Sequence, residues 1–126
     1  MNPTRAPTRA QRLGAAGEAA ALARLEAAGL RLLARNVRSR HGELDLVMRE
    51  GATLVFVEVR TRASTRHGGA LASVDAAKRR RLLCAAAEFL AQHRELAQCA
   101  CRFDIVGYDG HEGAPAQWLR GAFEAD

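Results

Sequence analysis

Residues 42–62, GELDLVMREGATLVFVEVRTR, decide the fold, because they read as two strands joined by a tight turn. Glycine at the first central position of the turn Glu50–Thr53 suits a two-residue type II′ connection. The runs on either side are rich in β-branched and apolar residues, which are typical of strands. We therefore expect an antiparallel hairpin with strands over Glu43–Arg49 and Leu54–Arg62.

The register of this hairpin places two acidic side chains face to face, because Asp45 lies opposite Glu58 when Gly51-Ala52 is the loop. The same register gathers six apolar side chains on the other face, namely Leu44, Leu46, Met48, Val55, Val57 and Val59. A slip of one residue would mix the two faces, so the pattern supports this register. The acidic face also carries three apolar side chains nearer the turn, Val47, Leu54 and Phe56. We therefore expect both carboxylates to be half-buried.

The rest of the chain supplies helices and further strands. Alanine-rich sequence with leucines at helical spacing predicts a first helix over Gln11–Ala28, which Gly29 would end. A second long helix is predicted over Ser73–Leu96, with Ser73 as its N-cap. Further strands are predicted over Leu30–Arg38 and Arg102–Tyr108, and a short strand or turn over Gln117–Leu119. Because a long helix between strands usually joins parallel neighbours, we predict an α/β fold with a mixed central β-sheet flanked by helices, in the order αβββαβ.

Length and composition limit the class of protein. The chain has 126 residues, 48% of them hydrophobic, which predicts one folded domain over residues 11–126 after a flexible basic arm over residues 1–10. No apolar run approaches the roughly 20 residues of a membrane helix, and the N-terminus lacks the apolar block of a secretory signal. The three cysteines have no zinc-binding spacing. We therefore expect a soluble, cytoplasmic protein with no membrane partner.

Basic residues outnumber acidic ones, 19 to 14, and Lys78 is the only lysine. The resulting net charge of +5 predicts attraction to polyanions, of which nucleic acid is the first candidate. The alternative is that abundant alanine and arginine reflect genome composition. Because aromatic residues make up only 5% of the chain, recognition of the backbone and shape of a nucleic acid is favoured over base stacking.

The opposed carboxylates need compensation, because like charges directly across a sheet repel each other. A proton, an arginine or a divalent cation would supply it. Arg60 lies on the same face, and Glu18 falls on the side of the first helix that should face the core. Mg²⁺ prefers oxygen ligands, commonly one or two carboxylates with waters and substrate phosphates. The alternative is an ion-pair ladder of Glu58 or Glu43 with Arg60 and no metal.

Several short motifs, in their order and spacing, resemble the uncharacterised bacterial YraN-like family. They span nearly the whole chain and comprise Gly17-Glu18-Ala19, Asn36 with Gly42-Glu43-Leu44-Asp45-Leu46, Phe56-Val57-Glu58-Val59-Arg60-Thr61-Arg62, Gly68, Val74 with Lys78, and Arg102-Phe103-Asp104-Ile105-Val106. That family looks like a minimal restriction-endonuclease-like, PD-(D/E)xK nuclease fold, close to the archaeal Holliday-junction resolvases. The resemblance implies a metal-dependent endonuclease acting on DNA, with branched or junction DNA as a candidate substrate and a homodimer as a candidate assembly.

The resemblance implies that Mg²⁺ or Mn²⁺ is held by the side chains of Glu18, Asp45 and Glu58 and by the carbonyl of Val59. Leu44 stands where the motif has proline, and Arg60 stands where it has its catalytic lysine. Arginine stays protonated and cannot act as a general base, but it can clamp a phosphate. Either the metal or another group then activates water, or the activity is weak or absent. Lys78 is a catalytic candidate that could reach the same cleft; the alternative is an ordinary lysine at the edge of an amphipathic helix.

Four arginines near the strand ends and the following loop are the candidates for nucleic-acid binding: Arg38, Arg40, Arg62 and Arg66. His41 and His67 lie near the same strand ends and are expected to be solvated. Asp104 is expected to pair with Arg102 rather than to join the acidic cluster. A metal-dependent DNA endonuclease is therefore the first hypothesis. A non-catalytic nucleic-acid-binding protein is the second, because Arg60 replaces the motif lysine, and a structural or partner-docking protein is the third.

Overall fold

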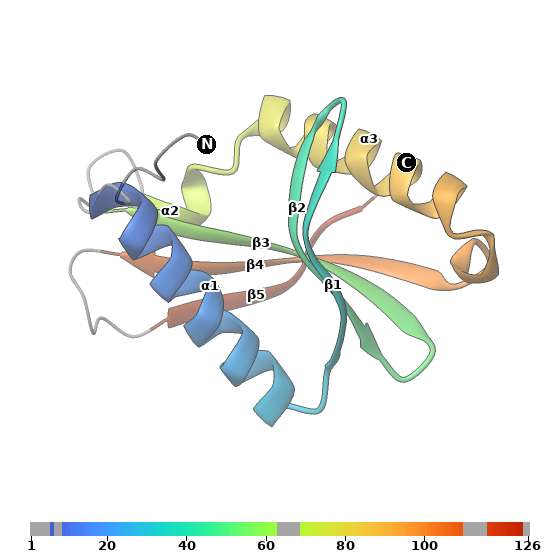
Figure 1. Cartoon of the computed structure of the whole chain (residues 1–126), viewed down its shortest axis with the longest axis horizontal. Helices are drawn as coiled ribbons and strands as arrows, with labels where there is room; N and C mark the ends of the chain where they lie inside the picture. Colours follow the sequence, from blue (N-terminus) through green and yellow to red (C-terminus); the bar gives the residue numbers. More distant parts are fainter. Residues whose placement is uncertain (1–5, 7–8, 63–68, 110–115, 125–126) are drawn as a thin grey trace.

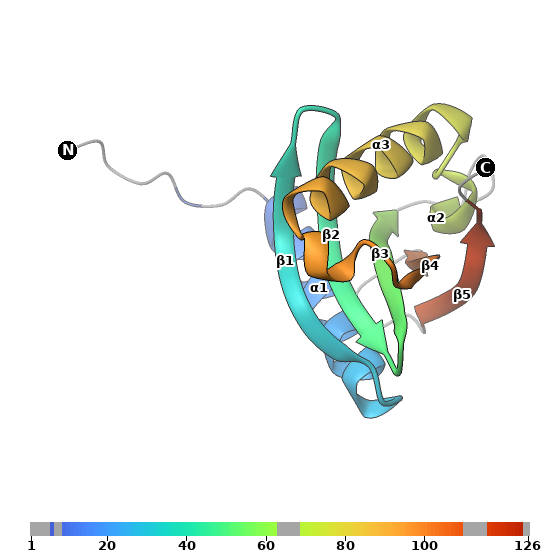
Figure 2. The same ribbon diagram turned by 90° about the vertical axis from the view of Figure 1, so that its right-hand side faces the viewer.

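The chain folds around one mixed β-sheet that has helices on both faces (Figures 1 and 2). This computed structural model describes residue 6 and residues 9–62, 69–109 and 116–124. The sheet has five strands in the order β1-β2-β3-β4-β5. The elements in chain order are α1 (Arg9–Ala27), β1 (Arg31–Ser39), β2 (Gly42–Glu50), β3 (Thr53–Arg62), α2 (Gly69–Ala72), α3 (Ala76–Gln92), the 3₁₀ turn η2 (Arg94–Leu96), β4 (Ala100–Asp109) and β5 (Ala116–Phe123). The predicted α/β class is confirmed.

The β2–β3 hairpin forms in the predicted register. Its paired residues run from Glu50↔Thr53 to Leu46↔Val57. Gly51 has a φ of 60°, the positive value that a type II′ turn requires at its first central position. β3 and β4 are parallel neighbours joined through α3, and every other neighbouring pair in the sheet is antiparallel. The predicted crossover helix is therefore confirmed.

Each face of the sheet has its own hydrophobic core. The α1 face buries Ala21, Leu25, Leu46, Met48, Val55, Val57 and Val106. The α3 face buries Leu44, Val47, Leu54, Phe56, Leu82, Ala85, Ala86, Phe89, Phe103 and Ile105. The prediction that Leu44 shares the face of Leu46 is wrong. β2 loses its regular alternation between these two residues, at the position of Asp45.

α1 ends as predicted, in a motif that turns the chain into the sheet. Gly29 has a φ of 100°, and the N–H of Leu30 donates to the carbonyl of Leu25 (3.0 Å), as in a Schellman cap. α1 begins at Arg9, so residues 9 and 10 belong to the helix rather than to the predicted arm, most of which lies outside the described residues. Among the helices that the structure describes, none is long and apolar enough to cross a membrane.

The start of α3 differs from the prediction. Its N-cap is Asp75, whose side chain accepts a hydrogen bond from the N–H of Lys78 (2.8 Å), and not Ser73. The hydroxyl of Ser73 instead donates to the carbonyl of Ala70 in the short helix α2, which the sequence analysis did not predict. Aspartate and serine cap helices about equally well, so residue type alone does not distinguish the two positions.

Gly17 brings α1 close to the sheet immediately before Glu18. A Cβ atom at Gly17 would lie 2.9 Å from Oγ1 of Thr61, whereas a Cβ at Gly14 of the same helix would have nothing within 4 Å. We expect Gly17→Val to lower the free energy of unfolding by about 1–3 kcal/mol through overpacking. Gly14→Val, the matched control, should change it by less than about 0.5 kcal/mol. Urea unfolding of both variants measures this, and equal effects would contradict the close approach.

Candidate active site

Asp45 lies where β2 separates from β3. The last described pair of that ladder is Leu46↔Val57, one position before Asp45 and Glu58. In a regular continuation the N–H of Val59 would donate to the carbonyl of Leu44, because hydrogen-bonded pairs alternate along an antiparallel ladder. Here it donates to Oδ2 of Asp45 at 2.8 Å. The aspartate side chain therefore replaces a backbone acceptor, which accounts for the change of face at Leu44.

The other edge of β2 is interrupted at the same place. β1 pairs with β2 at Arg35↔Leu46 and Val37↔Leu44, so the residue that stands across from Asp45 is Asn36. Asn36 has a left-handed backbone with a φ of 53°, the only positive φ of a non-glycine residue among those described. Asp45 thus lies at a local break between two neighbouring strands rather than in a regular ladder.

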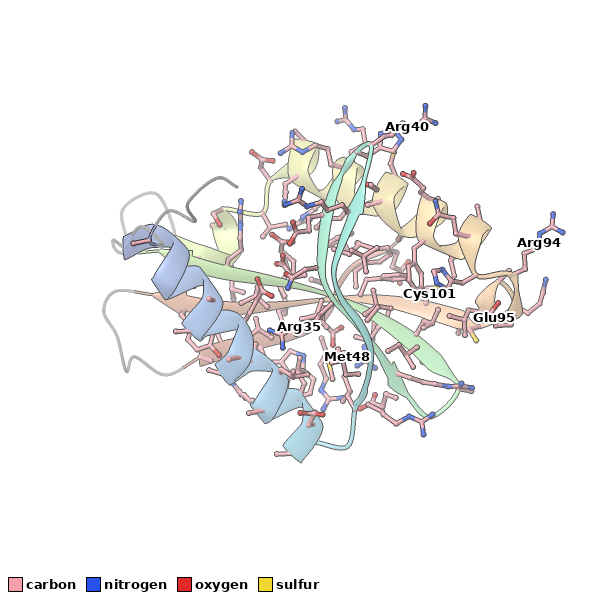
Figure 3. All side chains as sticks on the ribbon, in the orientation of Figure 1. Arg35, Arg40, Met48, Arg94, Glu95 and Cys101 are labelled. Atoms are coloured by element: carbon pink, nitrogen blue, oxygen red, sulfur yellow. The ribbon has the colours of Figure 1, made fainter. Side chains whose placement is uncertain are left out.

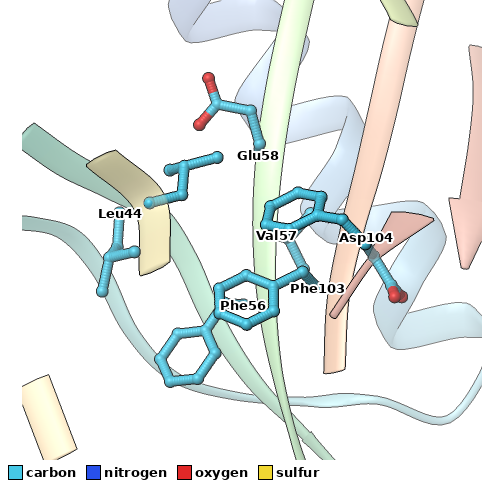
Figure 4. A pocket seen from close by; sticks show the side chains of 8 residues that line it. Leu44, Phe56, Val57, Glu58, Phe103 and Asp104 are labelled. Atoms are coloured by element: carbon cyan, nitrogen blue, oxygen red, sulfur yellow. The ribbon is translucent and has the colours of Figure 1, made fainter. Parts of the chain in front are cut away.

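Glu58 lies buried on the α3 face of β3, with an exposed fraction of 4%. Its Oε1 is 3.5 Å from Nζ of Lys78 and 3.8 Å from Nε of Arg60. Its Oε2 and the Nε of Arg60 are both buried and have no hydrogen-bond partner. The predicted alternative of a fully satisfied ion-pair ladder therefore does not describe this arrangement. In the close-up of Figure 4, Glu58 lies at one end of a group of mostly apolar side chains that includes Leu44 and Phe56.

The two carboxyl groups disfavour each other's charge. Burial first, and then the charge of the nearby Asp45, raise the pKa of Glu58 to about 7, while Lys78 and Arg60 act in the opposite direction. Burial also raises the pKa of Asp45, although the hydrogen bond from Val59 holds it down. Near neutral pH the pair therefore retains affinity for a proton or for another cation.

Glu18 approaches this pair from α1. Burial raises its pKa, and the next contribution comes from the charge of Asp45. Its Oε1 lies 4.0 Å from Nη2 of Arg35, whose side chain points from β1 toward α1 in Figure 3. The structure therefore places Glu18 within electrostatic reach of Asp45, on the α1 side, whereas Glu58 faces α3. Within residues 9–62, 69–109 and 116–124, no three His, Cys, Asp or Glu side chains group closely enough to enclose a metal ion.

Asp45 and Glu58 together fit the partial ligand set that Mg²⁺ or Mn²⁺ takes from proteins. Such ions commonly bind one or two carboxylates and complete their shell with waters and substrate phosphates. The buried Oε2 of Glu58 is an oxygen that lacks a hydrogen-bond donor. The donor chemistry is therefore that of a hard divalent cation.

Two basic side chains flank Glu58 from different elements. Arg60 follows it on β3, and its Nη2 donates to the carbonyl of Ser73 at 3.3 Å. Lys78 comes from the first turn of α3 and is 20% exposed. The single lysine of the chain thus contacts Glu58, beside the arginine that occupies the motif position.

The candidate nucleic-acid ligands are only partly described. Arg38 and Arg40 are exposed at the end of the β1–β2 hairpin, and Figure 3 shows Arg40 there next to α3. The backbone N–H of Arg40 donates to Oε2 of Glu88 at 3.2 Å, which ties this end of the hairpin to α3. Arg62 is the last residue of β3, and nothing is described of its side chain. Arg66 and His67 lie outside the described residues.

Asp104 pairs with Arg102, as predicted, and does not join the acidic pair. Its Oδ1 accepts from Nε of Arg102 at 2.9 Å and from the N–H of Gly121 in β5, and its Oδ2 accepts from Nε1 of Trp118 in β5. Figure 4 shows its carboxylate pointing away from that of Glu58. Asp104 therefore stabilises the β4–β5 side of the sheet.

One residue of the site has no role in the sequence analysis. Asn36 is part of one motif on which the family resemblance rests, but the sequence analysis assigned no function to this asparagine. Asparagine inside a predicted strand is a usable signal, because it is depleted in strands and tolerates the left-handed region. That signal marks the break opposite Asp45.

Comparison with known proteins gives the family of the chain. The model of the uncharacterised protein family UPF0102 matches residues 17–108. A UPF0102 protein of Xanthomonas campestris pv. campestris (strain B100) is 57% identical over 120 residues, which cover 95% of this chain and 98% of the relative. A UPF0102 protein of Pseudomonas putida (strain GB-1) is 50% identical over 124 residues, which cover 97% of this chain and 98% of the relative. The matched range contains Glu18, Asp45, Glu58 and Lys78, and the chain belongs to the UPF0102 family.

Proposed function

We propose that this protein is a metal-dependent endonuclease that hydrolyses phosphodiester bonds of DNA. The observation that carries the proposal is the pair of half-buried Asp45 and buried Glu58. The pKa values of both are raised, and Oε2 of Glu58 has no hydrogen-bond partner. Two carboxylates buried side by side destabilise a fold unless something positive binds them. Perturbed carboxyl groups of this kind are enriched at functional sites.

Asp45 and Glu58 are the residues that would hold Mg²⁺ or Mn²⁺, with Glu18 and the carbonyl of Val59 as the further ligands that the resemblance implies. A bound divalent cation would polarise the phosphodiester and lower the pKa of a water. Arg60 would bind a phosphate oxygen, since it carries a fixed charge beside the pair. Lysine, unlike arginine, serves as a general base in some enzymes, so Lys78 beside Glu58 is the residue that would assist the attacking water.

DNA is the proposed substrate because the chain carries a net charge of +5 and places exposed arginines beside the hairpin. Arg38 and Arg40, with Arg62 and Arg66, would contact the phosphate backbone. Branched or junction DNA and a homodimer are the finer parts of the proposal, since cutting two strands symmetrically needs two sites. The free thiols of Cys84, Cys99 and Cys101 fit a reducing compartment, for which we propose the cytoplasm.

Asp45→Asn tests the proposal most directly. We expect wild-type protein to cleave linear or branched DNA with Mg²⁺ or Mn²⁺, and the variant to be at least about 100-fold slower, because the neutral amide weakens metal binding. Gel assays on labelled duplexes and four-way junctions measure this. Asp75→Asn is the matched control, since asparagine caps a helix as well as aspartate does. Equal cleavage by the wild type and the Asp45 variant would contradict the mechanism.

The second candidate is a nucleic-acid-binding protein that does not cleave. Arg60 at the lysine position favours it, because an arginine cannot accept the proton of a water. Calorimetry with Mg²⁺ and DNA-binding titrations at several salt concentrations separate the two functions. A steep loss of DNA affinity with salt, together with no Mg²⁺ binding and no cleavage, would favour the binding protein.

A further inference from the structure

Asn36 holds an uncommon backbone conformation at a defined place. It stands across from Asp45, between the pairs Arg35↔Leu46 and Val37↔Leu44, with a φ of 53°. The left-handed region costs an L-residue about 1–2 kcal/mol, although asparagine tolerates it better than most. A residue held in this region beside a candidate active site points to a role for its side chain.

The side-chain amide of Asn36 joins two acids from different elements. In the orientation that satisfies both ends of the amide, Nδ2 donates to Oε1 of Glu18 at 2.9 Å and to Oε1 of Glu43 at 3.0 Å. Glu18 belongs to α1, and Glu43 lies on β2 two residues before Asp45. One NH₂ group has two hydrogens and can serve both acceptors at once. The amide thus connects α1 to the strand that carries Asp45.

Among the described side chains, the cation nearest to Glu18 is Arg35, which lies farther from it than the Asn36 amide does. The contact from Nη2 of Arg35 measures 4.0 Å, and the Arg35 side chain is 44% exposed. Exposed ion pairs at that distance contribute little. An amide also differs from a guanidinium in kind, because it orients a carboxylate without neutralising it. Glu18 held by Asn36 therefore keeps its negative charge available for a cation.

We propose that Asn36 is a positioning residue that holds Glu18 beside Asp45. The left-handed backbone lets the side chain of a β1 residue reach α1 and β2 together, and the amide fixes Glu18 without adding charge. This inference rests on the proposed function, because it makes Glu18 part of the metal site. Asn36 itself would not bind the metal ion, because its amide is engaged by Glu18 and Glu43.

Two substitutions separate the amide from the backbone conformation. Asn36→Gly removes the amide and keeps free access to a positive φ, whereas Asn36→Ala removes the amide and strains the backbone. Calorimetric titration with Mn²⁺ should give dissociation constants 10- to 100-fold higher for both variants, which is typical when a partner that orients a metal ligand is lost. Only Asn36→Ala should also unfold at a lower urea concentration. Mn²⁺ binding by Asn36→Gly as tight as that of wild type would overturn the inference.

A spectroscopic test does not depend on any metal. The chain has two asparagines, Asn2 and Asn36, so ¹⁵N-asparagine labelling gives two side-chain NH₂ signals, and Asn36→Gly assigns them. We expect the Asn36 NH₂ protons to be shifted from free-amide values and to move toward them in Glu18→Ala. No response to Glu18→Ala would overturn the inference whatever the metal does. Failure of wild-type protein to bind Mn²⁺ would contradict the proposed function instead, and the inference would fall with it.

Discussion

Glu58→Gln should stabilise the metal-free protein above pH 7 while it abolishes metal-dependent cleavage. Glu58 is 4% exposed, and its pKa rises from the ordinary 4.5 to about 7, chiefly because burial disfavours its charge. A raised pKa in the folded state means that the folded protein is more stable when Glu58 is protonated than when it is charged. Its stabilising contribution is complete below about pH 4.5 and is lost as the pH rises through 7. Glutamine resembles the protonated acid and therefore keeps this contribution at high pH.

The expected gain is on the order of 3 kcal/mol at pH 8, since one pKa unit corresponds to about 1.4 kcal/mol. At pH 4 the variant and the wild type should have nearly equal free energies of unfolding, because both then carry a neutral side chain. Urea unfolding at pH 4, 6 and 8 in EDTA measures the difference. Glu26→Gln, on the exposed side of α1, is the control and should not change the pH dependence.

The same variant tests the metal. Adding Mg²⁺ or Mn²⁺ at pH 8 should raise the unfolding midpoint of the wild type by mass action and leave that of Glu58→Gln unchanged. Cleavage of DNA should fall at least about 100-fold in the variant. A stabilised variant that still cleaves would remove Glu58 from the mechanism. A variant less stable than wild type at pH 8 would show that Lys78 and Arg60 hold the Glu58 carboxylate more strongly than burial opposes it.

The hairpin was predictable because it depends on local rules. Gly51 at the first turn position fixes the register, and the apolar side chains of Leu46, Met48, Val55 and Val57 on one face exclude a slip. The crossover helix and the mixed sheet follow from a long helix between two strands, and the structure has both. The pairing of Asp104 with Arg102, expected in place of a role in the acidic cluster, is also present.

The break at Asp45 was not predictable, because it depends on competition between side chain and backbone. A regular ladder would give the Val59 N–H to the Leu44 carbonyl, but the Asp45 carboxylate accepts it instead. The hydrophobic periodicity of a strand does not indicate when a side chain replaces a backbone acceptor. The sequence analysis therefore placed Leu44 on the wrong face. The left-handed backbone of Asn36 occurs at the same break, directly across from Asp45. Tertiary contact between α1 and the two strands holds it, and no local pattern contains that contact.

Asp104→Ala should cost the fold about 3–5 kcal/mol, the loss expected when one partner of a buried charged network is removed. Asp104 is 1% exposed and accepts from Nε and Nη2 of Arg102, from Nε1 of Trp118 and from the N–H of Gly121, at 2.9 to 3.1 Å. Alanine would leave all these donors without an acceptor and weaken the attachment of β5 to β4, which would then depend on the backbone ladder. Urea unfolding at pH 7 measures the loss.

Arg120→Ala is the control for this network, because Arg120 is 48% exposed and bonds the outer acid Glu50. It also lies 3.9 Å above the ring of Trp118, so its removal should cost about 1 kcal/mol. Asp104 and Glu58 both lie within the sheet but point to opposite faces, so the two sites should respond independently. At a low temperature at which the Asp104→Ala variant remains folded, its affinity for Mn²⁺ should therefore equal that of the wild type. A loss of Mn²⁺ affinity in parallel with stability would mean that β5 supports the acidic pair through the sheet.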